Sequence, residues 1–114
     1  MPTVADRVVQ ALRGAGVPRL FGVPGGGSNL DLLEAARAQG LPFVLCHQES
    51  AACIMAAVTG ELTGSPGAAL ATLGPGATAS ATGLAYAFLD RAPMLLLTDR
   101  HPAAALRLTT HQTV

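Results

Sequence analysis

Glu49 is the side chain in this sequence that is best placed to do chemistry. It follows an apolar run at residues 43–46 and opens an alanine-rich stretch, and residues 51–54 offer it no cationic partner. A carboxylate that faces an apolar cleft has a raised proton affinity, whereas a helix N-terminus lowers it, so the two effects oppose each other. Acidic residues are also common in the first turn of a helix, where the helix dipole favours them. The sequence therefore leaves two interpretations of Glu49, a functional acid and a helix-stabilising residue.

A glycine loop, Gly74-Pro75-Gly76, follows another apolar run. Gly74, Gly76 and Ala79 match the dinucleotide-binding pattern G-x-G-x-x-A, and Asp99 lies downstream. The proline removes an amide donor that a phosphate-binding turn would use. The simpler interpretation is a tight strand-to-helix turn, in which glycine tolerates positive φ. A non-catalytic α/β domain that binds a nucleotide or a protein partner through this loop is kept as the alternative function.

A second glycine loop, Pro24-Gly25-Gly26-Gly27, also follows an apolar run. Its glycines lack the G-x-G-x-x-G spacing because position 30 is leucine. The sequence contains no lysine, which excludes a P-loop lysine and a Schiff-base lysine within it. The loop is either a flexible turn or a place where a flat ligand can approach the backbone closely.

The histidines and cysteines do not predict a metal site. His47, His101 and His111 are scattered, and no HExxH or CxxC spacing occurs. Each histidine is interpreted as a surface or loop residue. Cys46 and Cys53 are too few for a disulfide scaffold, which favours buried thiols in a reducing cytoplasm.

Alternating strands and helices must position these loops. Apolar runs predict strands at residues 19–23, 43–46, 68–73 and 94–98. Helices are predicted after a Thr3 cap, from Ser28 or Asn29, over residues 49–62 and over residues 77–89. Because the strands are apolar on both faces, the fold class is α/β, with a parallel sheet and helices on both faces. The three loops follow strands, so we expect them at the carboxyl edge of the sheet, where such folds bind ligands.

Composition fits one domain over residues 1–114. Half of the residues are apolar, and seven basic side chains balance seven acidic ones. No basic field points to nucleic acid, and no apolar stretch reaches membrane-spanning length. The chain stops without a capping element after the last clear strand. We therefore expect a fragment, or one part of a larger or split enzyme.

Short motifs run in a fixed order along nearly the whole chain. They are Phe21-Gly22-Val23-Pro24-Gly25-Gly26, His47-Gln48-Glu49-Ser50-Ala51-Ala52, Thr63-Gly64, Pro66-Gly67, Leu73-Gly74-Pro75-Gly76-Ala77-Thr78 and Asp90-Arg91-Ala92-Pro93-Met94. No single motif is decisive, but the ordered set with compatible spacing resembles one family. That family is the N-terminal, pyrimidine-binding domain of thiamine-diphosphate-dependent enzymes of the acetolactate synthase and 2-oxoacid decarboxylase type.

The resemblance implies a role for Glu49. In the family, a glutamate bonds to the pyrimidine ring nitrogen and favours the imino tautomer that removes the thiazolium proton, and Glu49 falls in that slot. The cofactor then acts as electron sink for a 2-oxoacid substrate. The same resemblance implies cofactor contacts at Pro24, Gly25, Glu49, Gly74, Pro75 and Gly76, and a substrate side at Gly26, His47 and Gln112.

The resemblance also implies partners. In the family, a Gly-Asp-Gly motif followed by Asn-Asn holds Mg²⁺ and the diphosphate, and this sequence has no such motif. The metal and the diphosphate are therefore expected on a diphosphate-binding domain of the same or another chain, in a homodimer or tetramer, and this chain alone should be inactive.

The sequence departs from the family pattern at three places. Gln48 stands where many relatives have histidine, Ala79 stands where asparagine is common, and residues 57–61 differ from the usual Gly-Tyr-Ala-Arg segment. These departures leave the substrate open, as well as the choice between decarboxylation and carboligation.

Overall fold

The computed structural model describes residues 1–104 and contains a four-stranded parallel sheet. The strands are β1 (Leu20–Val23), β2 (Phe43–Leu45), β3 (Gly67–Ala71) and β4 (Met94–Leu97), in the spatial order β2-β1-β3-β4. All three pairings are parallel. The predicted parallel sheet, with strands at these four positions, is confirmed.

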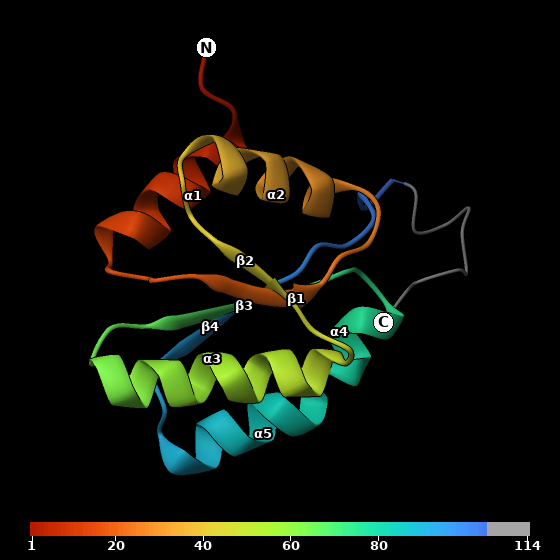
Figure 1. Ribbon diagram of the computed structural model, residues 1–114. Coiled ribbons are helices and arrows are strands. Elements are labelled where there is room, and N and C mark those ends of the chain that lie inside the picture. The colour runs from red at the N-terminus through yellow and green to blue at the C-terminus, as the bar shows by residue number, and fades with distance from the viewer. Residues whose placement is uncertain (105–114) are drawn as a thin grey trace.

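Helices cover both faces of this sheet. Helices α1 (Val4–Gly14) and α2 (Ser28–Ala38) lie on one face, and α3 (Glu49–Thr63) and α5 (Ala81–Asp90) lie on the other (Figure 1). A short helix, α4 (Pro75–Ala79), precedes α5. Within residues 1–104, no helix has the length and apolar character needed to cross a membrane.

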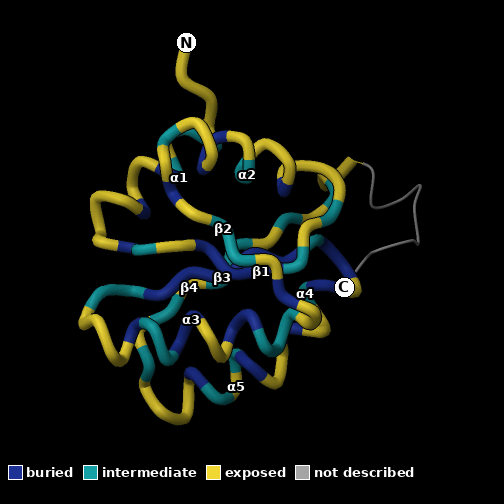
Figure 2. Tube along the Cα trace, viewed as in Figure 1, coloured by how far each residue is buried: buried dark blue, intermediate teal, exposed yellow. Residues whose placement is uncertain are grey.

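The core has two parts, one on each face of the sheet, because successive strand residues point to opposite sides. Leu20 and Ala68 pack with α1 and α2, whereas Phe21 and Ala69 pack with α3. Strand β3 is buried along its whole length, as expected for a central strand with helices above and below (Figure 2). The sheet therefore forms a rigid base for the loops at its carboxyl edge.

The N-cap predicted from the sequence is confirmed for α1 but not for α2. Thr3 and Asp6 form the predicted capping box, with the Asp6 amide donating to Thr3 Oγ1 at 3.1 Å. In α2, the N-cap is Gly27 and no side chain caps the helix, so the prediction of a Ser28 or Asn29 cap was wrong. The reason is that the Ser28 hydroxyl donates to Asp99 instead.

The helix predicted over residues 77–89 is divided at Ser80. Its side chain is buried, and both its hydroxyl and its amide donate to the Gly76 carbonyl, at 2.9 and 3.2 Å. Serine hydroxyls that bond backward to a carbonyl in this way often bend helices. As a result, the second part of the glycine loop belongs to a separate short helix, α4, which precedes α5.

Candidate functional site

The three loops singled out in the sequence leave the sheet at the same edge, as predicted. Pro24 follows the last residue of β1, Glu49 begins α3 after β2, and Gly74 lies just beyond the end of β3. All strands are parallel, so their carboxyl ends lie together. In sheets of this kind, that edge is where ligands bind.

The Glu49 carboxylate lies next to the Gly74–Gly76 loop. Glu49 is half-buried, and its Oε1 is 3.5 Å from the position that a Cβ on Gly76 would take. Gln48 precedes the helix in extended backbone and provides no side-chain cap. Among residues 1–104, no hydrogen bond or ion pair engages the Glu49 carboxylate. Its oxygens are therefore available to a ligand at this edge.

Thr72 is the residue that sequence reasoning missed. It is the first residue after β3, and its side chain fills the space that two glycines leave. A Cβ on Gly25 would lie 2.3 Å from Thr72 Cβ, and one on Gly76 would lie 2.8 Å from Thr72 Cγ2. Both glycines are thus required by packing against Thr72. Its position directly after a buried strand was the only signal in the sequence.

The remaining predicted site residues differ in their exposure. Gly74 and Gly76 are buried, whereas Pro24, Pro75, Gly26 and His47 are exposed and Gly25 is half-buried. A Cβ on Gly26 would meet nothing within 4 Å, so space is open there. Thr72 packs against Gly25 and Gly76, Glu49 lies beside Gly76, and no hydrogen bond joins His47 to these residues. Gln112 lies outside the described residues.

Hydrogen bonds between elements hold this edge in place. Ser28 donates to Asp99 Oδ2 through both its amide, at 3.2 Å, and its hydroxyl, at 2.5 Å. The Thr98 hydroxyl donates to the Thr72 carbonyl at 3.3 Å. Ser50, next to Glu49, donates to the Ala79 carbonyl at 2.5 Å. The first turn of α3 is therefore tied to the end of α4, which fixes Glu49 relative to the glycine loop.

The arrangement disfavours a phosphate at the Gly74–Gly76 loop. The Glu49 carboxylate lies beside Gly76 and would repel an anion there. Pro75, the first residue of α4, has no amide to donate. Asp99, which the dinucleotide pattern would assign to a ribose, accepts hydrogen bonds from Ser28.

Cys53 lies close to Glu49 but is not a candidate nucleophile. Burial raises the pKa of the Cys53 thiol, and the nearby Glu49 and Cys46 raise it further, although a hydrogen bond with Ser80 opposes this. A thiol with a raised pKa stays protonated and unreactive at neutral pH. Among residues 1–104, no group of three or more histidine, cysteine or acidic side chains could hold a metal ion.

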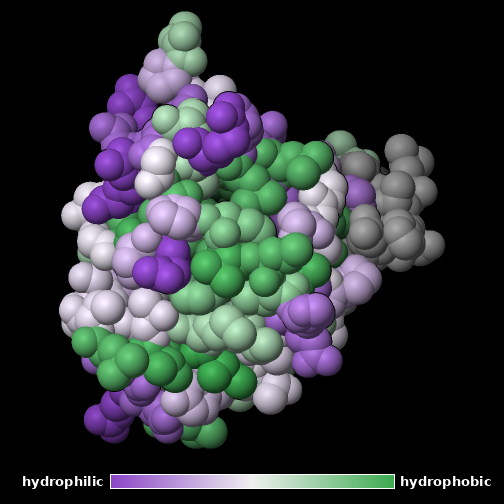
Figure 3. Space-filling view, in the orientation of Figure 1, coloured by the Kyte–Doolittle hydropathy of each residue, from purple (hydrophilic) through white to green (hydrophobic). Residues whose placement is uncertain are grey.

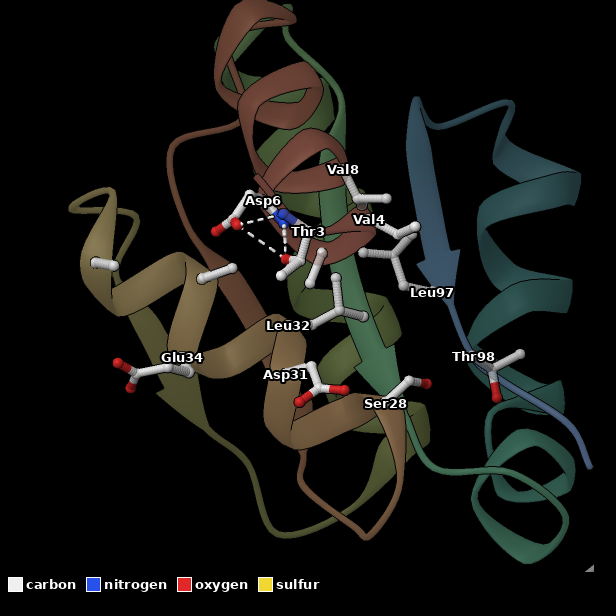
Figure 4. Close-up of a pocket in the computed structure, with 13 residues that line it drawn as sticks. Thr3, Val4, Asp6, Val8, Ser28, Asp31, Leu32, Glu34, Leu97 and Thr98 are labelled. Atoms are coloured by element: carbon white, nitrogen blue, oxygen red, sulfur yellow. Dashed lines mark hydrogen bonds between the residues drawn. The ribbon is translucent and has the colours of Figure 1, made fainter. Parts of the chain in front are cut away.

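A cavity of about 750 Å³ lies away from Glu49, between α1, α2 and the edge strand β4 (Figure 4). Asp6, Asp31 and Glu34 contribute acidic groups to its lining, and Val8 and Leu97 contribute apolar ones. A smaller cavity of about 430 Å³ lies at the carboxyl edge and includes Thr72 and Gly26. Of these two cavities, only the smaller one adjoins the site residues that were predicted from the sequence.

Comparison with known proteins identifies one family. The family model described as "Thiamine pyrophosphate enzyme, N-terminal TPP binding domain" matches residues 2–114. The chain is 39% identical over 116 residues to the acetolactate synthase of Arthrospira platensis, covering 98% of this chain and 20% of that protein. It is 38% identical over 110 residues to the acetolactate synthase isozyme 2 large subunit of Escherichia coli K12, covering 96% of this chain and 20% of that subunit.

A third relative, the acetolactate synthase large subunit of Haemophilus influenzae, is 41% identical over 97 residues, which are 84% of this chain and 17% of that subunit. The chain thus spans about a fifth of the length of the curated relatives it matches. The family model covers nearly every residue, and its fold class agrees with the parallel sheet described above. The chain therefore belongs to the family of N-terminal thiamine pyrophosphate-binding domains of thiamine pyrophosphate enzymes.

Proposed function

We propose that this domain holds the aminopyrimidine ring of thiamine diphosphate at the carboxyl edge of its sheet, with Glu49 as the group that shares a proton with the ring. One observation carries the proposal: the half-buried Glu49 carboxylate has no partner among the described residues and lies beside Gly76, across Thr72 from Gly25. A ring nitrogen is a suitable partner for a carboxyl group in that position.

The residues present fit such a ring. Glu49 offers a carboxyl oxygen, and Gly26 leaves open space beside the loop that contains Pro24 and Gly25. Gly76 lies beside Glu49, and the Ser50–Ala79 hydrogen bond holds α4 against α3. When bound, the cofactor would supply an acidic thiazolium carbon and an electron sink. This chain's part is to hold a proton at the Glu49 carboxyl, to orient the ring and to exclude water.

The proposed reaction class follows from the relatives, which are named acetolactate synthases. A 2-oxoacid is the substrate, and the enzyme is a lyase or transferase that decarboxylates it or joins it to a second carbonyl compound. Gly26, His47 and Gln112 remain the proposed substrate side. The cytoplasm remains the proposed compartment, in keeping with two free, buried cysteines.

The working enzyme needs a second part. The chain spans about a fifth of the length of its relatives, and its sequence has no Gly-Asp-Gly motif. Mg²⁺ and the diphosphate are therefore held by a diphosphate-binding domain of the same or another chain. Residues 1–114 form the pyrimidine-binding domain and are inactive without that second part.

Assembly involves the face that contains α3 and α5. Large apolar side chains are exposed there: Leu62, Phe88 and Leu89 are 82, 82 and 77% exposed. On the face seen in Figure 3, hydrophobic surface extends across β2 and α3, whereas hydrophilic residues gather over α1 and α2. Exposed apolar patches of this kind are typical of interaction sites. These helices form part of a subunit or domain interface in a homodimer or tetramer.

The experiment is hydrogen exchange at the thiazolium carbon in the assembled enzyme, measured for Glu49→Gln and Glu61→Gln. Glutamine can still hydrogen-bond but cannot share a proton, so Glu49→Gln should slow the exchange by about 10²- to 10⁴-fold. Glu61, exposed in the last turn of α3, is the matched control and should leave the rate unchanged. A wild-type exchange rate in a folded, cofactor-loaded Glu49→Gln enzyme would contradict the proposed role.

A further inference from the structure

The Thr72 side chain lies between the two glycine loops of the candidate site. Its methyl carbon, Cγ2, is 2.9 Å from the position that a Cβ on Gly25 would take and 2.8 Å from the corresponding position on Gly76. Its hydroxyl oxygen lies on the Gly25 side, 2.4 Å from the first of these positions. The methyl group is therefore the end of the side chain that adjoins both loops.

The backbone at Thr72 is held by side chains from other elements. The Thr72 carbonyl accepts a hydrogen bond from the Thr98 hydroxyl at 3.3 Å, and the Ala71 carbonyl accepts one from the Asn29 side-chain amide at 3.4 Å. Ala71 and Leu73, on either side of Thr72, are buried. Because the backbone is fixed in this way, the sheet sets the position of the methyl group.

The Thr72 methyl group and the Glu49 carboxylate share the space beside Gly76. Glu49 Oε1 is 3.5 Å from the same Cβ position that lies 2.8 Å from Thr72 Cγ2. Loss of the methyl group would leave a void there, which the neighbouring groups would fill in part by moving. The separation of Gly76 from Glu49 therefore depends on Thr72.

We propose that Thr72 is a positioning residue, whose methyl group keeps Gly76 at a fixed separation from Gly25 and from the Glu49 carboxylate. The inference rests on the proposed function, because these are the groups that are proposed to hold the pyrimidine ring. Thr72 itself shares no proton with the ring. Small displacements of reacting groups have large effects on rate, so one methyl group is enough to alter the reaction.

The first test separates the methyl group from the hydroxyl in the assembled, cofactor-saturated enzyme. Thr72→Ser removes the methyl group and should slow hydrogen exchange at the thiazolium carbon by about tenfold to hundredfold. Thr72→Val keeps a methyl group in place and should restore most of the wild-type rate. Thr59→Ser is the matched control, because Thr59 is half-buried further along α3 and its hydroxyl donates to the Met55 carbonyl at 2.7 Å. It should exchange at the wild-type rate.

The second test needs no cofactor. A Cβ on Gly76 would lie 2.8 Å from Thr72 Cγ2, but its next neighbours, Glu49 Oε1 at 3.5 Å and Thr72 Cβ at 3.6 Å, are at ordinary contact distances. Gly76→Ala should therefore speed amide exchange in the first turn of α3 by about tenfold, and adding Thr72→Ser should reverse most of this change. Gly25→Ala should not be relieved by Thr72→Ser, because its Cβ would still lie 2.3 Å from the Cβ of residue 72.

Three results would each overturn the inference: a wild-type thiazolium exchange rate in Thr72→Ser, a rate in Thr72→Val as low as in Thr72→Ser, or no relief of Gly76→Ala by Thr72→Ser. The outcome is separate from that of Glu49→Gln. Slow exchange in Glu49→Gln together with any of these results rejects only the role of Thr72. Relief of Gly76→Ala together with a wild-type rate in Glu49→Gln rejects only the proposed role of Glu49.

Discussion

The two helical layers of this domain differ in what they present outward. The layer formed by α1 and α2 presents charged and polar groups, including Arg7, Arg13 and an exposed Glu34–Arg37 ion pair. The layer formed by α3 and α5 has its apolar Phe88 and Leu89 largely exposed. The first layer also exposes two apolar side chains, Val4 and Leu30, but they stand among charged groups. The second layer has the surface of an element that another protein part covers.

The layer with apolar outer residues is also the layer that contains the candidate site. Glu49 opens α3, and the Gly74–Gly76 loop opens α4 ahead of α5. The layer formed by α1 and α2 contributes to the candidate site only the loop that precedes α2. We propose on this basis that the site lies at a seam, because the elements that hold Glu49 are also the ones that expose large apolar side chains. The following predictions test whether the two layers differ in this way.

The largest effect is expected from an added methyl group between α3 and α5. A Cβ on Gly83 would lie 2.4 Å from Cys53 Cβ and 2.6 Å from the Ser50 carbonyl oxygen. Because the second contact is with backbone, the helices must separate, and Gly83→Ala should lower the local free energy of opening by about 3 kcal/mol. Hydrogen–deuterium exchange of α3 and α5 amides in the assembled enzyme measures this loss.

Gly14→Ala provides the control in the other layer. Gly14 is the last residue of α1, and a Cβ there would meet nothing within 4 Å. Alanine should leave α1 protection unchanged or raise it by up to roughly 1 kcal/mol, because it restricts the unfolded chain. If Gly83→Ala changed amide protection as little as Gly14→Ala does, the close packing of α3 on α5 would not be what positions Glu49.

In both layers, the sequence identified the buried face of the helices only in part. In α1, apolar residues recur at helical spacing, yet Val4 is 82% exposed whereas Val9 and Leu12 are buried. In α3, small and apolar residues surround most of the helix, so periodicity does not identify the buried face. Ala52, Cys53 and Gly60 are buried there, whereas the large apolar Met55 is 45% exposed.

The candidate site shows the same limit. Strand order and loop placement follow from alternating apolar runs, so Glu49 and both glycine loops could be assigned to one edge in advance. Thr72 could not, because its role depends on Gly25 and Gly76 approaching it from loops far apart in the sequence. The division of the last helix at Ser80 likewise depends on a buried hydroxyl bonding backward to Gly76. Such contacts are properties of packing, which local sequence does not encode.

A smaller effect is expected on assembly. Phe88 in α5 and Val4 in α1 are equally exposed, at 82% each, but lie in different layers. If α5 is in an interface, Phe88→Ser should weaken subunit association by about 2 kcal/mol, which is roughly a thirtyfold change in the dissociation constant. Val4→Ser should leave association unchanged. Light scattering over a range of concentrations measures subunit association in both variants. Equal association of the two variants would show that the two layers do not differ in this respect.

The smallest effect is expected at the cap of α1, far from the proposed seam. Thr3→Ala removes a cap and should destabilise α1 by about 1 kcal/mol, with no change in association or thiazolium exchange.

Hydrogen bonds from Thr3 hold the pKa of Asp6 below its ordinary value of 3.8. A lowered carboxyl pKa contributes stability that is present above pH 3.8 and is lost as the pH falls through the lower folded-state value. The difference in α1 stability between wild type and Thr3→Ala should therefore be full at neutral pH and shrink below pH 3.8. Amide exchange of α1 followed against pH checks this, and a difference that stayed constant on acidification would show that the cap acts without the Asp6 carboxylate.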